Sequence, residues 1–413
     1  MTRTDNNVSF SISSVCYLIY FLLKPFYLFD SGTLQLGDFF LLISFAFLVF
    51  ERRNGIRNDD YIFEVFLVCV FIINFIYFFI YQGSEFLKSC LYYVFNLIVI
   101  LCFRNFMYDR KWLNALGVVC KFNLLIQLAI FLLHRGAYWE GTYRYMGTYT
   151  DPNQMGFAVV STLAILFLLK DKWKYLYVLV AALLIVQTSS GGMLITLCLL
   201  VGLDSMIILK KAMDNGGISY TLLFIIILGI GAVIILIMAD IIHIDWDHFR
   251  ISDKLQSNDS VLQSFINDRA LNVAQEHPEY FLFGYGEGFS FPRYGHSEEL
   301  HSTWISLCYY YGVLPFFILL AWIYSNLKHI KLEVVPVYVA IFLEAFTLAN
   351  HRQASFWMII LLANVCCRDD SAYEYNNESE IEEIKSAAPP AKKKYEDIVA
   401  QIRATRPSVI MDP

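Results

Sequence analysis

The sequence predicts an all-α polytopic membrane protein, because its composition is strongly apolar and its apolar residues form long runs separated by short basic loops. Of the 413 residues, 57% are hydrophobic and 16% are charged. A soluble domain is nearer half apolar and a quarter charged. A single core cannot bury this much apolar surface, so we expect lipid to surround most of the chain.

The apolar runs predict about twelve transmembrane helices, since a spanning helix needs about 20 apolar residues. The seventh and eighth could form one bent hairpin, and the last two are short. The first run lacks a basic n-region and a small-residue cleavage site, so we expect a retained helix. The predicted helices are 9–29, 34–50, 61–81, 87–103, 113–133, 153–169, 175–188, 191–209, 218–239, 302–325, 334–349 and 356–367.

Basic residues orient these helices, because cytoplasmic loops are enriched in Lys and Arg. Alternate short loops carry Arg52, Arg53, Arg57, Arg104, Arg110, Lys111, Lys170, Lys172, Lys174, Lys210, Lys211, Lys328 and Lys331. The other loops are longer and hold fewer basic residues. This asymmetry predicts that both termini are cytoplasmic.

Two long segments, 134–152 and 240–301, are then extracytoplasmic, and the second joins the ninth and tenth helices. Loops of that length are usually functional. The second loop contains an amphipathic pattern at 261–276, which His277-Pro278 ends. Glycines at Gly284 and Gly286 begin the turn-rich stretch that follows.

The last 46 residues differ from the rest. Residues 368–413 combine an acidic run, an Ala-Ala-Pro-Pro break and a lysine cluster. Such a composition predicts a disordered cytoplasmic tail, with a short interaction helix at 393–404 as the alternative. We therefore expect a transmembrane domain at 1–367 and a separate tail.

The sequence contains no recognisable metal or disulfide pattern. All nine cysteines lie in or beside apolar runs, as packing residues do. His243, His248, His296 and His301 share one loop without HxH or HxxxH spacing. We expect no metal.

The extracytoplasmic arginines are candidates for phosphate binding, because a guanidinium matches phosphate oxygens and keeps its charge. Arg250 is flanked by acids, and local pairing explains it better. Arg144 begins a pattern that ends Asp151-Pro152-Asn153 before a predicted helix. Helix capping by Asp151 or Asn153 explains the end of that pattern equally well. A capped helix terminus can also bind an anion.

A second pattern spans nearly fifty residues. It contains Arg269, then His277-Pro278, the Gly284-Tyr-Gly-Glu-Gly288 run, His301-Ser302 and Tyr311-Gly312. Together with the Arg144 pattern, this order and loop placement resemble the O-antigen polymerase and ligase superfamily, the Wzy-type polymerases and WaaL-type ligases. One departure is Ser190, which occupies a place where relatives often have arginine.

The resemblance implies a GT-C-like fold in a bacterial cytoplasmic (inner) membrane. It implies metal-independent transfer of a glycan from an undecaprenyl diphosphate carrier to an acceptor hydroxyl on the outer face, with no cofactor. The product would be O-antigen, capsular polysaccharide or exopolysaccharide. Membrane lipid is an expected partner, nucleic acid is not, and a chain-length regulator could bind the tail.

Site roles follow from that chemistry. The diphosphate needs cations, for which Arg144, Arg269, Arg293 and Arg352 are the candidates. The acceptor hydroxyl needs a base, for which His301 leads and Glu298 and Glu299 are rivals. A polymerase is favoured over a ligase that transfers glycan to lipid A–core. A lipid-linked glycan transporter is a remote alternative, because few ionisable residues lie mid-helix.

Overall fold

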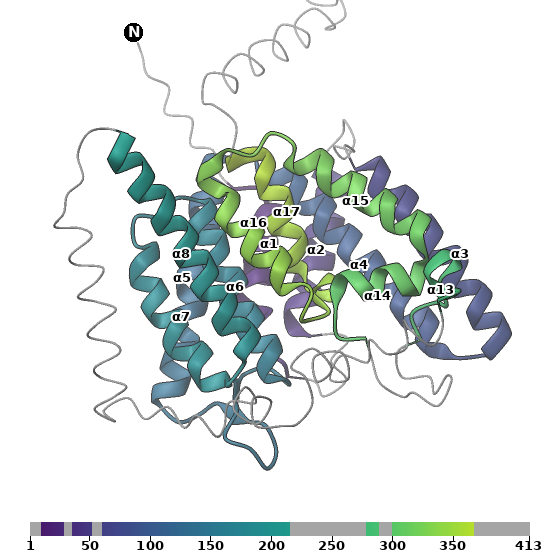
Figure 1. The fold of residues 1–413 in the computed structure, drawn as a ribbon, viewed down its shortest axis with the longest axis horizontal. Coiled ribbons are helices and arrows are strands. Elements are labelled where there is room, and N and C mark those ends of the chain that lie inside the picture. The colour runs from purple at the N-terminus through teal and green to yellow at the C-terminus, as the bar shows by residue number, and fades with distance from the viewer. Residues whose placement is uncertain (1–9, 29–34, 52–59, 215–277, 289–299, 367–413) are drawn as a thin grey trace, which may run out of the picture. The chain divides into compact units, whose positions relative to one another are not determined.

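The computed structural model describes residues 10–28, 35–51, 60–214, 278–288 and 300–366 (Figure 1). The chain divides after Cys367, and the predicted tail at 368–413 lies outside the described residues. So do Arg269, Arg293, Glu298 and Glu299, together with the amphipathic pattern at 261–276.

Helices dominate the described part of the chain. Helix α3 packs against α4 and α15, and α17 packs against both α4 and α6. The helices are α1 (Ile12–Leu23), α2 (Leu36–Glu51), α3 (Tyr61–Tyr81), α4 (Ser84–Phe106), α5 (Arg110–Leu132), α6 (Pro152–Leu168), α7 (Lys174–Thr188), α8 (Gly191–Asp214), α13 (Tyr280–Phe283), α14 (Thr303–Tyr311), α15 (Val313–Leu327), α16 (Val335–Glu344) and α17 (Ala354–Cys366), with short 3-10 turns η2 (Leu332–Val334) and η3 (Asn350–Arg352).

The helical fold class is confirmed, whereas the number of spans stays a prediction. Among the described residues, α3, α4, α5 and the Gly191–Ala212 part of α8 are long and apolar enough to cross a membrane. Other apolar helices, such as α6 and α17, are shorter. The predicted ninth helix, 218–239, lies outside the described residues.

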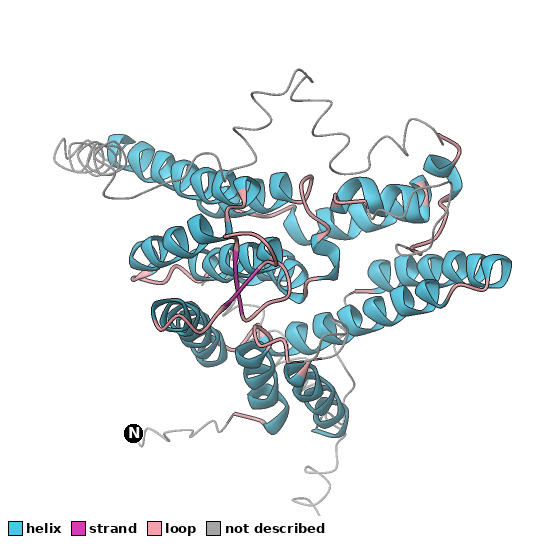
Figure 2. Cartoon of the chain, turned by 90° about the horizontal axis from the view of Figure 1, so that it is seen from below, coloured by secondary structure: helices cyan, strands magenta, loops and turns pink. Residues whose placement is uncertain are grey.

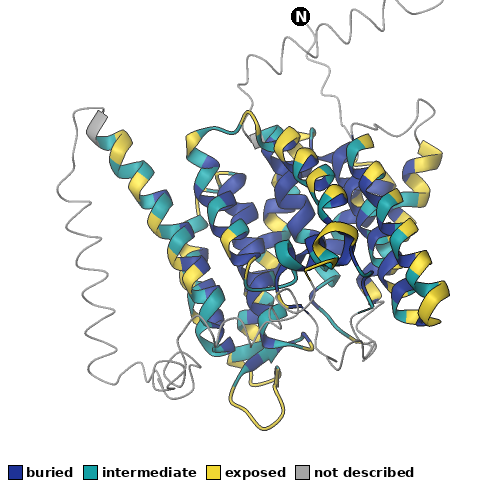
Figure 3. Cartoon of the chain, turned by 45° about the vertical axis from the view of Figure 1, so that its right-hand side comes forward, coloured by how far each residue is buried: buried dark blue, intermediate teal, exposed yellow. Residues whose placement is uncertain are grey.

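Exposed apolar side chains support a lipid environment. On α3, Ile72, Phe79 and Ile80 are 55%, 68% and 59% exposed. Exposed residues follow the outer faces of several helices, while buried residues fill the space between them (Figure 3). Large contiguous apolar surfaces are rare on soluble proteins, so these faces are suited to lipid.

The predicted helix 302–325 is wrong in one respect, because it is broken at Gly312 into α14 and α15. Gly312 has φ +80°, and a Cβ there would lie 2.5 Å from the Leu282 carbonyl oxygen. The facing Gly284 has φ +71°, and its Cβ would lie 2.5 Å from the Tyr310 carbonyl oxygen. Two backbones therefore approach at positions that only glycine tolerates.

That approach satisfies the end of α14. The Tyr285 amide donates to the Tyr309 carbonyl at 3.1 Å, and the Gly286 amide donates to the Tyr310 carbonyl at 2.9 Å. The last carbonyls of a helix have no partner within it, and in lipid none would come from water. The glycine run and the Gly312 break thus form one structural unit.

Arg104 is a second correction, since it lies inside α4 and not in a cytoplasmic loop. Its side chain is 4% exposed and forms a salt bridge with the fully buried Asp60. The guanidinium also donates to Asn326 at 3.0 Å. Arg104 therefore joins α4 to α15 and adds nothing to the basic loop charge.

The loop at 134–152 contains a small antiparallel hairpin that the sequence did not predict (Figure 2). Strand β1 (Ala137–Tyr138) pairs with β2 (Tyr145–Gly147). Gly141, with φ +69°, lies in the turn between them. Arg144 comes directly before β2, so the hairpin fixes its backbone.

Candidate functional site

Glu287 is the centre of a buried polar network in the segment between α13 and α14. Its side chain is fully buried. The Glu287 amide donates to Asn74 Oδ1 at 2.9 Å, and the Glu287 carbonyl accepts from Ser89 Oγ at 2.6 Å. Helices α3 and α4 therefore hold the backbone of the glycine run in place.

The Glu287 carboxylate binds three side chains. Its Oε1 accepts from Arg352 Nε at 2.9 Å and from Arg352 Nη2 at 2.5 Å. His351 Nε2 lies 3.3 Å from the same oxygen. Tyr311 Oη donates to Oε2 at 2.5 Å. The predicted phosphate ligand Arg352 is thus oriented by a carboxylate from a distant part of the chain.

The charge of this network is balanced inside the protein. Burial alone raises the pKa of Glu287, but the positive charge of Arg352 and the contacts with His351 and Tyr311 outweigh it and lower the pKa to about 2. Glu287 is therefore ionised at neutral pH. It does not serve as a general base there, because a base must hold a proton reversibly near the working pH.

His301 lies beside the same network by virtue of its neighbours. Ser302 caps α14, accepting from the Ile305 amide at 3.4 Å. Thr303 Oγ1 donates to the Leu348 carbonyl at 2.7 Å and accepts from the Asn350 amide at 2.6 Å. The segment that begins at His301 is therefore fixed to the turn η3 that carries Arg352. The His301 side chain is exposed.

Arg144 belongs to a second cluster, at the start of α6. Its Nη2 donates to Asn153 Oδ1 at 2.9 Å, and its Nε donates to the Thr188 carbonyl at 3.0 Å. The same Asn153 oxygen accepts from Ser190 Oγ at 3.0 Å. Ser190, which replaces an expected arginine, thus contributes a neutral hydroxyl beside Arg144.

Capping and arginine binding are divided between the two polar residues of the Asp151-Pro152-Asn153 pattern. Asp151 caps α6, because its carboxylate accepts from the Asn153 amide at 2.7 Å and the Gln154 amide at 3.0 Å. Pro152 occupies the first turn. The Asn153 side chain is left to hold Arg144, so the pattern is explained by both functions together.

The two clusters meet through the start of α8. A Cβ at Gly192 would lie 3.0 Å from Thr347 Oγ1. Thr347 contacts Glu344, which also accepts from Asn350 in η3. Residues directly after Ser190 therefore touch the loop that leads to Arg352. The starts of α6, α8, α14 and α17 gather the Arg144 cluster, His301 and Arg352 at one end of the helices.

Some predicted site residues are not brought together in the described part of the chain. Arg269, Arg293, Glu298 and Glu299 lie outside it. Arg135 is described and exposed, at the far side of the hairpin from Arg144. Within the described ranges, no group of three His, Cys, Asp or Glu residues is arranged to hold a metal ion.

Sequence reasoning gave no role to Glu287 or His351. Glu287 was visible as the one acid inside the glycine run, and His351 directly precedes Arg352. An acid flanked by glycines reads equally well as an exposed turn residue. Only the fold reveals that Asn74, from α3, supplies the contact that buries it.

No family model, curated protein or solved structure matches this chain. Its function is therefore argued from the residues of the site.

Proposed function

We propose that this chain is a polysaccharide polymerase that transfers glycan from an undecaprenyl diphosphate carrier to the acceptor hydroxyl of a second lipid-linked repeat unit. The observation that carries the proposal is the gathering of Arg144, Arg352 and the His301 segment at one end of the helices. These residues come from three separate parts of the sequence, and their motifs prompted the resemblance.

The chemistry requires cations at the leaving diphosphate. Guanidinium groups fixed in advance stabilise developing negative charge better than mobile ones, because they do not reorganise during reaction. Arg144 is fixed by Asn153 and Thr188, and Arg352 is fixed by Glu287. Arg269 and Arg293 are the further candidates of the long loop.

A lipid carrier requires an apolar groove, and one lies next to the His301 segment. It has a volume of about 500 Å³ and is bounded by α14, α15 and α16. Its walls include Trp304 and Tyr309 of α14, Phe316 of α15 and Phe342 of α16. Trp304 is three residues from His301, so a lipid chain in this groove would end near the proposed base.

The proposed orientation places this end of the helices outside a bacterial cytoplasmic membrane, with both termini inside. The basic pattern of the sequence supports it even without Arg104. Lys170 and Lys211 both pair with Glu333, beyond the opposite ends of α6 and α8.

Transport is less well supported. Pumps and transporters use ionisable residues within the membrane to move protons or ions. Here those near the apolar runs are paired with each other: Lys24 with Asp38 at 2.8 Å, Lys121 with Asp171 at 2.7 Å, and Lys174 with Asp204 at 3.0 Å.

The test is chain extension in membranes from a host strain lacking this gene, supplied with purified lipid-diphosphate repeat. We expect Arg144→Ala to abolish polymer and Arg144→Lys to restore it only in part, because a point charge does not replace a planar fork. Arg135→Ala, from the same loop, is the matched control and should extend normally. Normal polymer from Arg144→Ala would refute the assignment. Transfer to lipid A–core in place of the repeat would identify a ligase.

A further inference from the structure

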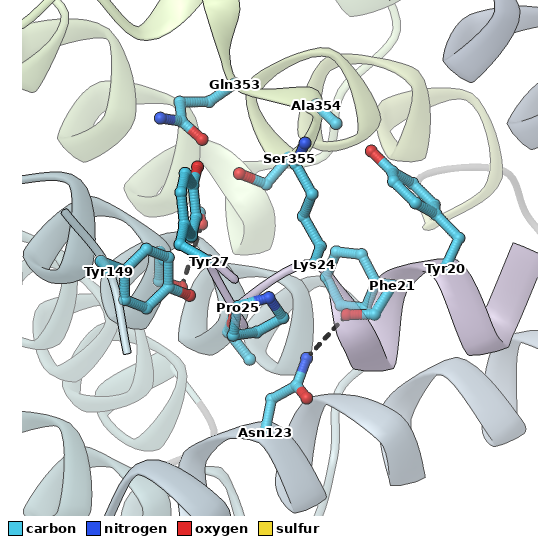
Figure 4. Close-up of a pocket in the computed structure, with 13 residues that line it drawn as sticks. Tyr20, Phe21, Lys24, Pro25, Tyr27, Asn123, Tyr149, Gln353, Ala354 and Ser355 are labelled. Atoms are coloured by element: carbon cyan, nitrogen blue, oxygen red, sulfur yellow. Dashed lines mark hydrogen bonds between the residues drawn. The ribbon is translucent and has the colours of Figure 1, made fainter. Parts of the chain in front are cut away.

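A small polar cavity lies between α1, α5, α6 and the start of α17 (Figure 4). Its walls include Tyr20 and Lys24 at the end of α1, Asn123 of α5, Tyr149 and Gln353. The cavity volume is about 30 Å³. One water-sized group needs ~10–15 Å³, so the cavity holds about two such groups and not a whole sugar ring.

Two buried polar atoms in this wall have no hydrogen-bond partner among the described residues. They are the Tyr20 hydroxyl, on a side chain that is 0% exposed, and Asn123 Oδ1, on a side chain that is 5% exposed. The Asn123 amide nitrogen donates to the Phe21 carbonyl at 3.0 Å, which fixes the direction of its oxygen. A buried polar group without a partner is unfavourable, so a ligand that meets both would be stabilised.

The charge in the cavity favours a neutral ligand. Lys24 is the cation of the wall, and its Nζ lies 2.8 Å from Oδ1 of the fully buried Asp38. The same nitrogen lies 5.4 Å from the centre of the Phe95 ring. A diphosphate would have to compete with Asp38 for this lysine. A hydroxyl can donate to Asn123 Oδ1 and accept from the Tyr20 hydroxyl without any change of charge.

Aromatic rings complete the wall. Tyr27 and Tyr149 have ring centres 5.4 Å apart, and both line the cavity. Figure 4 shows the Tyr27 ring turned towards Gln353, with Lys24 extending alongside. Aromatic faces combined with hydroxyl and amide groups present apolar surface and hydrogen-bonding partners together, which a carbohydrate also does.

The cavity is connected to both arginine clusters. Tyr149 lies in the same loop as Arg144, and the Tyr27 amide donates to the Thr148 carbonyl of that loop at 3.1 Å. Gln353 directly follows Arg352. A group bound here would therefore lie between the segments that carry the two proposed diphosphate ligands.

We propose that this cavity binds a hydroxyl or hydroxymethyl group of the acceptor sugar, through the Tyr20 hydroxyl and the Asn123 side-chain oxygen. The proposal rests on the proposed function, since it names the acceptor subsite of that reaction. It assigns positioning of the acceptor to α1 and α5, which carry none of the motifs behind the resemblance.

Tyr20→Phe is the sharpest test, because it removes one hydroxyl without a described partner and leaves the ring in place. Tyr145→Phe is the matched control: the Tyr145 hydroxyl is also buried without a described partner, and it does not line the cavity. Both variants should fold as well as the native chain. In chain extension with lipid-diphosphate repeat, Tyr20→Phe should raise the KM for acceptor roughly three- to tenfold, the effect of one hydrogen bond. The Tyr145→Phe variant should leave it unchanged.

A second measurement does not depend on turnover. Methyl pyranosides of the sugars in that repeat should raise the melting temperature of the purified native protein, and raise it less for Tyr20→Phe. Equal KM values and equal shifts in the two variants would overturn the acceptor subsite. If the native chain extends no polymer but a pyranoside still discriminates between the variants, the proposed function fails and the sugar-binding cavity stands.

Discussion

The guanidinium of Arg352 donates through both Nε and Nη2 to a single oxygen of the buried Glu287 carboxylate, although the two residues are 65 positions apart in sequence. The other carboxylate oxygen accepts from Tyr311. The pair therefore joins the glycine run, the end of α14 and the turn η3. It fixes the relative positions of the segments that bear the proposed site.

Removing one partner of this pair should destabilise the protein strongly. We expect Glu287→Gln to lower the free energy of unfolding in mixed micelles by about 3–5 kcal/mol, because it leaves a guanidinium with little exposure and no carboxylate. The double variant Glu287→Gln with Arg352→Gln should lose less than the two single variants combined. Additive losses would show that the two residues act independently.

Acid should remove the same contribution. The pKa of Glu287 is about 2 in the folded protein, against an ordinary value of 4.5. Because the folded pKa is the lower one, the stabilisation is fully present above about pH 4.5 and is lost as the pH falls towards 2. The difference in melting temperature between the native protein and Glu287→Gln should be constant near neutrality and shrink across that window. A difference that did not change between pH 5 and 2.5 would contradict the assignment.

The break in the predicted tenth helix makes a separate prediction about backbone. Gly312 has φ +80° and ψ 170°, a region that is almost exclusively occupied by glycine. Gly312→Ala should therefore cost roughly 1–3 kcal/mol of stability, with a further cost from the contact with Leu282. Gly202→Ala is the control, because a Cβ there meets nothing within 4 Å in α8. That substitution should be neutral or stabilising by up to about 1 kcal/mol. A stable Gly312→Ala protein would mean that α14 and α15 can form one continuous helix.

The proposed orientation can be checked with two single cysteines in a cysteine-free variant. Glu140→Cys lies in the exposed turn of the hairpin, and Lys172→Cys lies in the exposed loop between α6 and α7. In cells with a permeabilised outer membrane, an impermeant maleimide should label the first and not the second. The reverse pattern would place the arginine clusters inside the cell, where the proposed reaction does not occur.

Periodicity and length predicted the helices well, because an apolar run of sufficient length has few alternatives in lipid. Helices α3 and α6 begin and end within one residue of their predicted limits. The break at Gly312 was missed because it depends on the distant Leu282 and Gly284, which no local pattern reveals. The buried pairing of Arg104 was missed for the same reason, since Asp60 lies 44 residues away.

The candidate site was predictable in part. The loop motifs identified Arg144, Asn153 and the His301 segment, and each of these occurs at the same end of the helices. What the motifs lacked was the side chains that hold them: Asn74, Glu287 and Thr347 come from other elements and carry no signature of their own. Motif residues are visible in sequence because their order is distinctive, whereas supporting residues become visible only when packing brings them into contact.

The proposed base is the remaining prediction, and the exposed His301 is the candidate. Its neighbours Ser302 and Thr303 are fixed to α14 and to η3, so the backbone of His301 is anchored next to Arg352 while its ring stays accessible to an acceptor. If His301 takes the acceptor proton, His301→Gln should reduce the rate of chain extension by about 10²–10⁴-fold, the usual cost of losing a general base. The purified protein should be compared with Glu298→Gln across a range of pH, using the lipid-diphosphate repeat as both donor and acceptor. Histidine titrates near neutral pH, so the native rate should fall below that range and the His301→Gln rate should lack this fall. A His301→Gln protein that keeps more than about a tenth of the rate with the native pH profile would transfer the proton elsewhere, and a loss confined to Glu298→Gln would identify that carboxylate as the base.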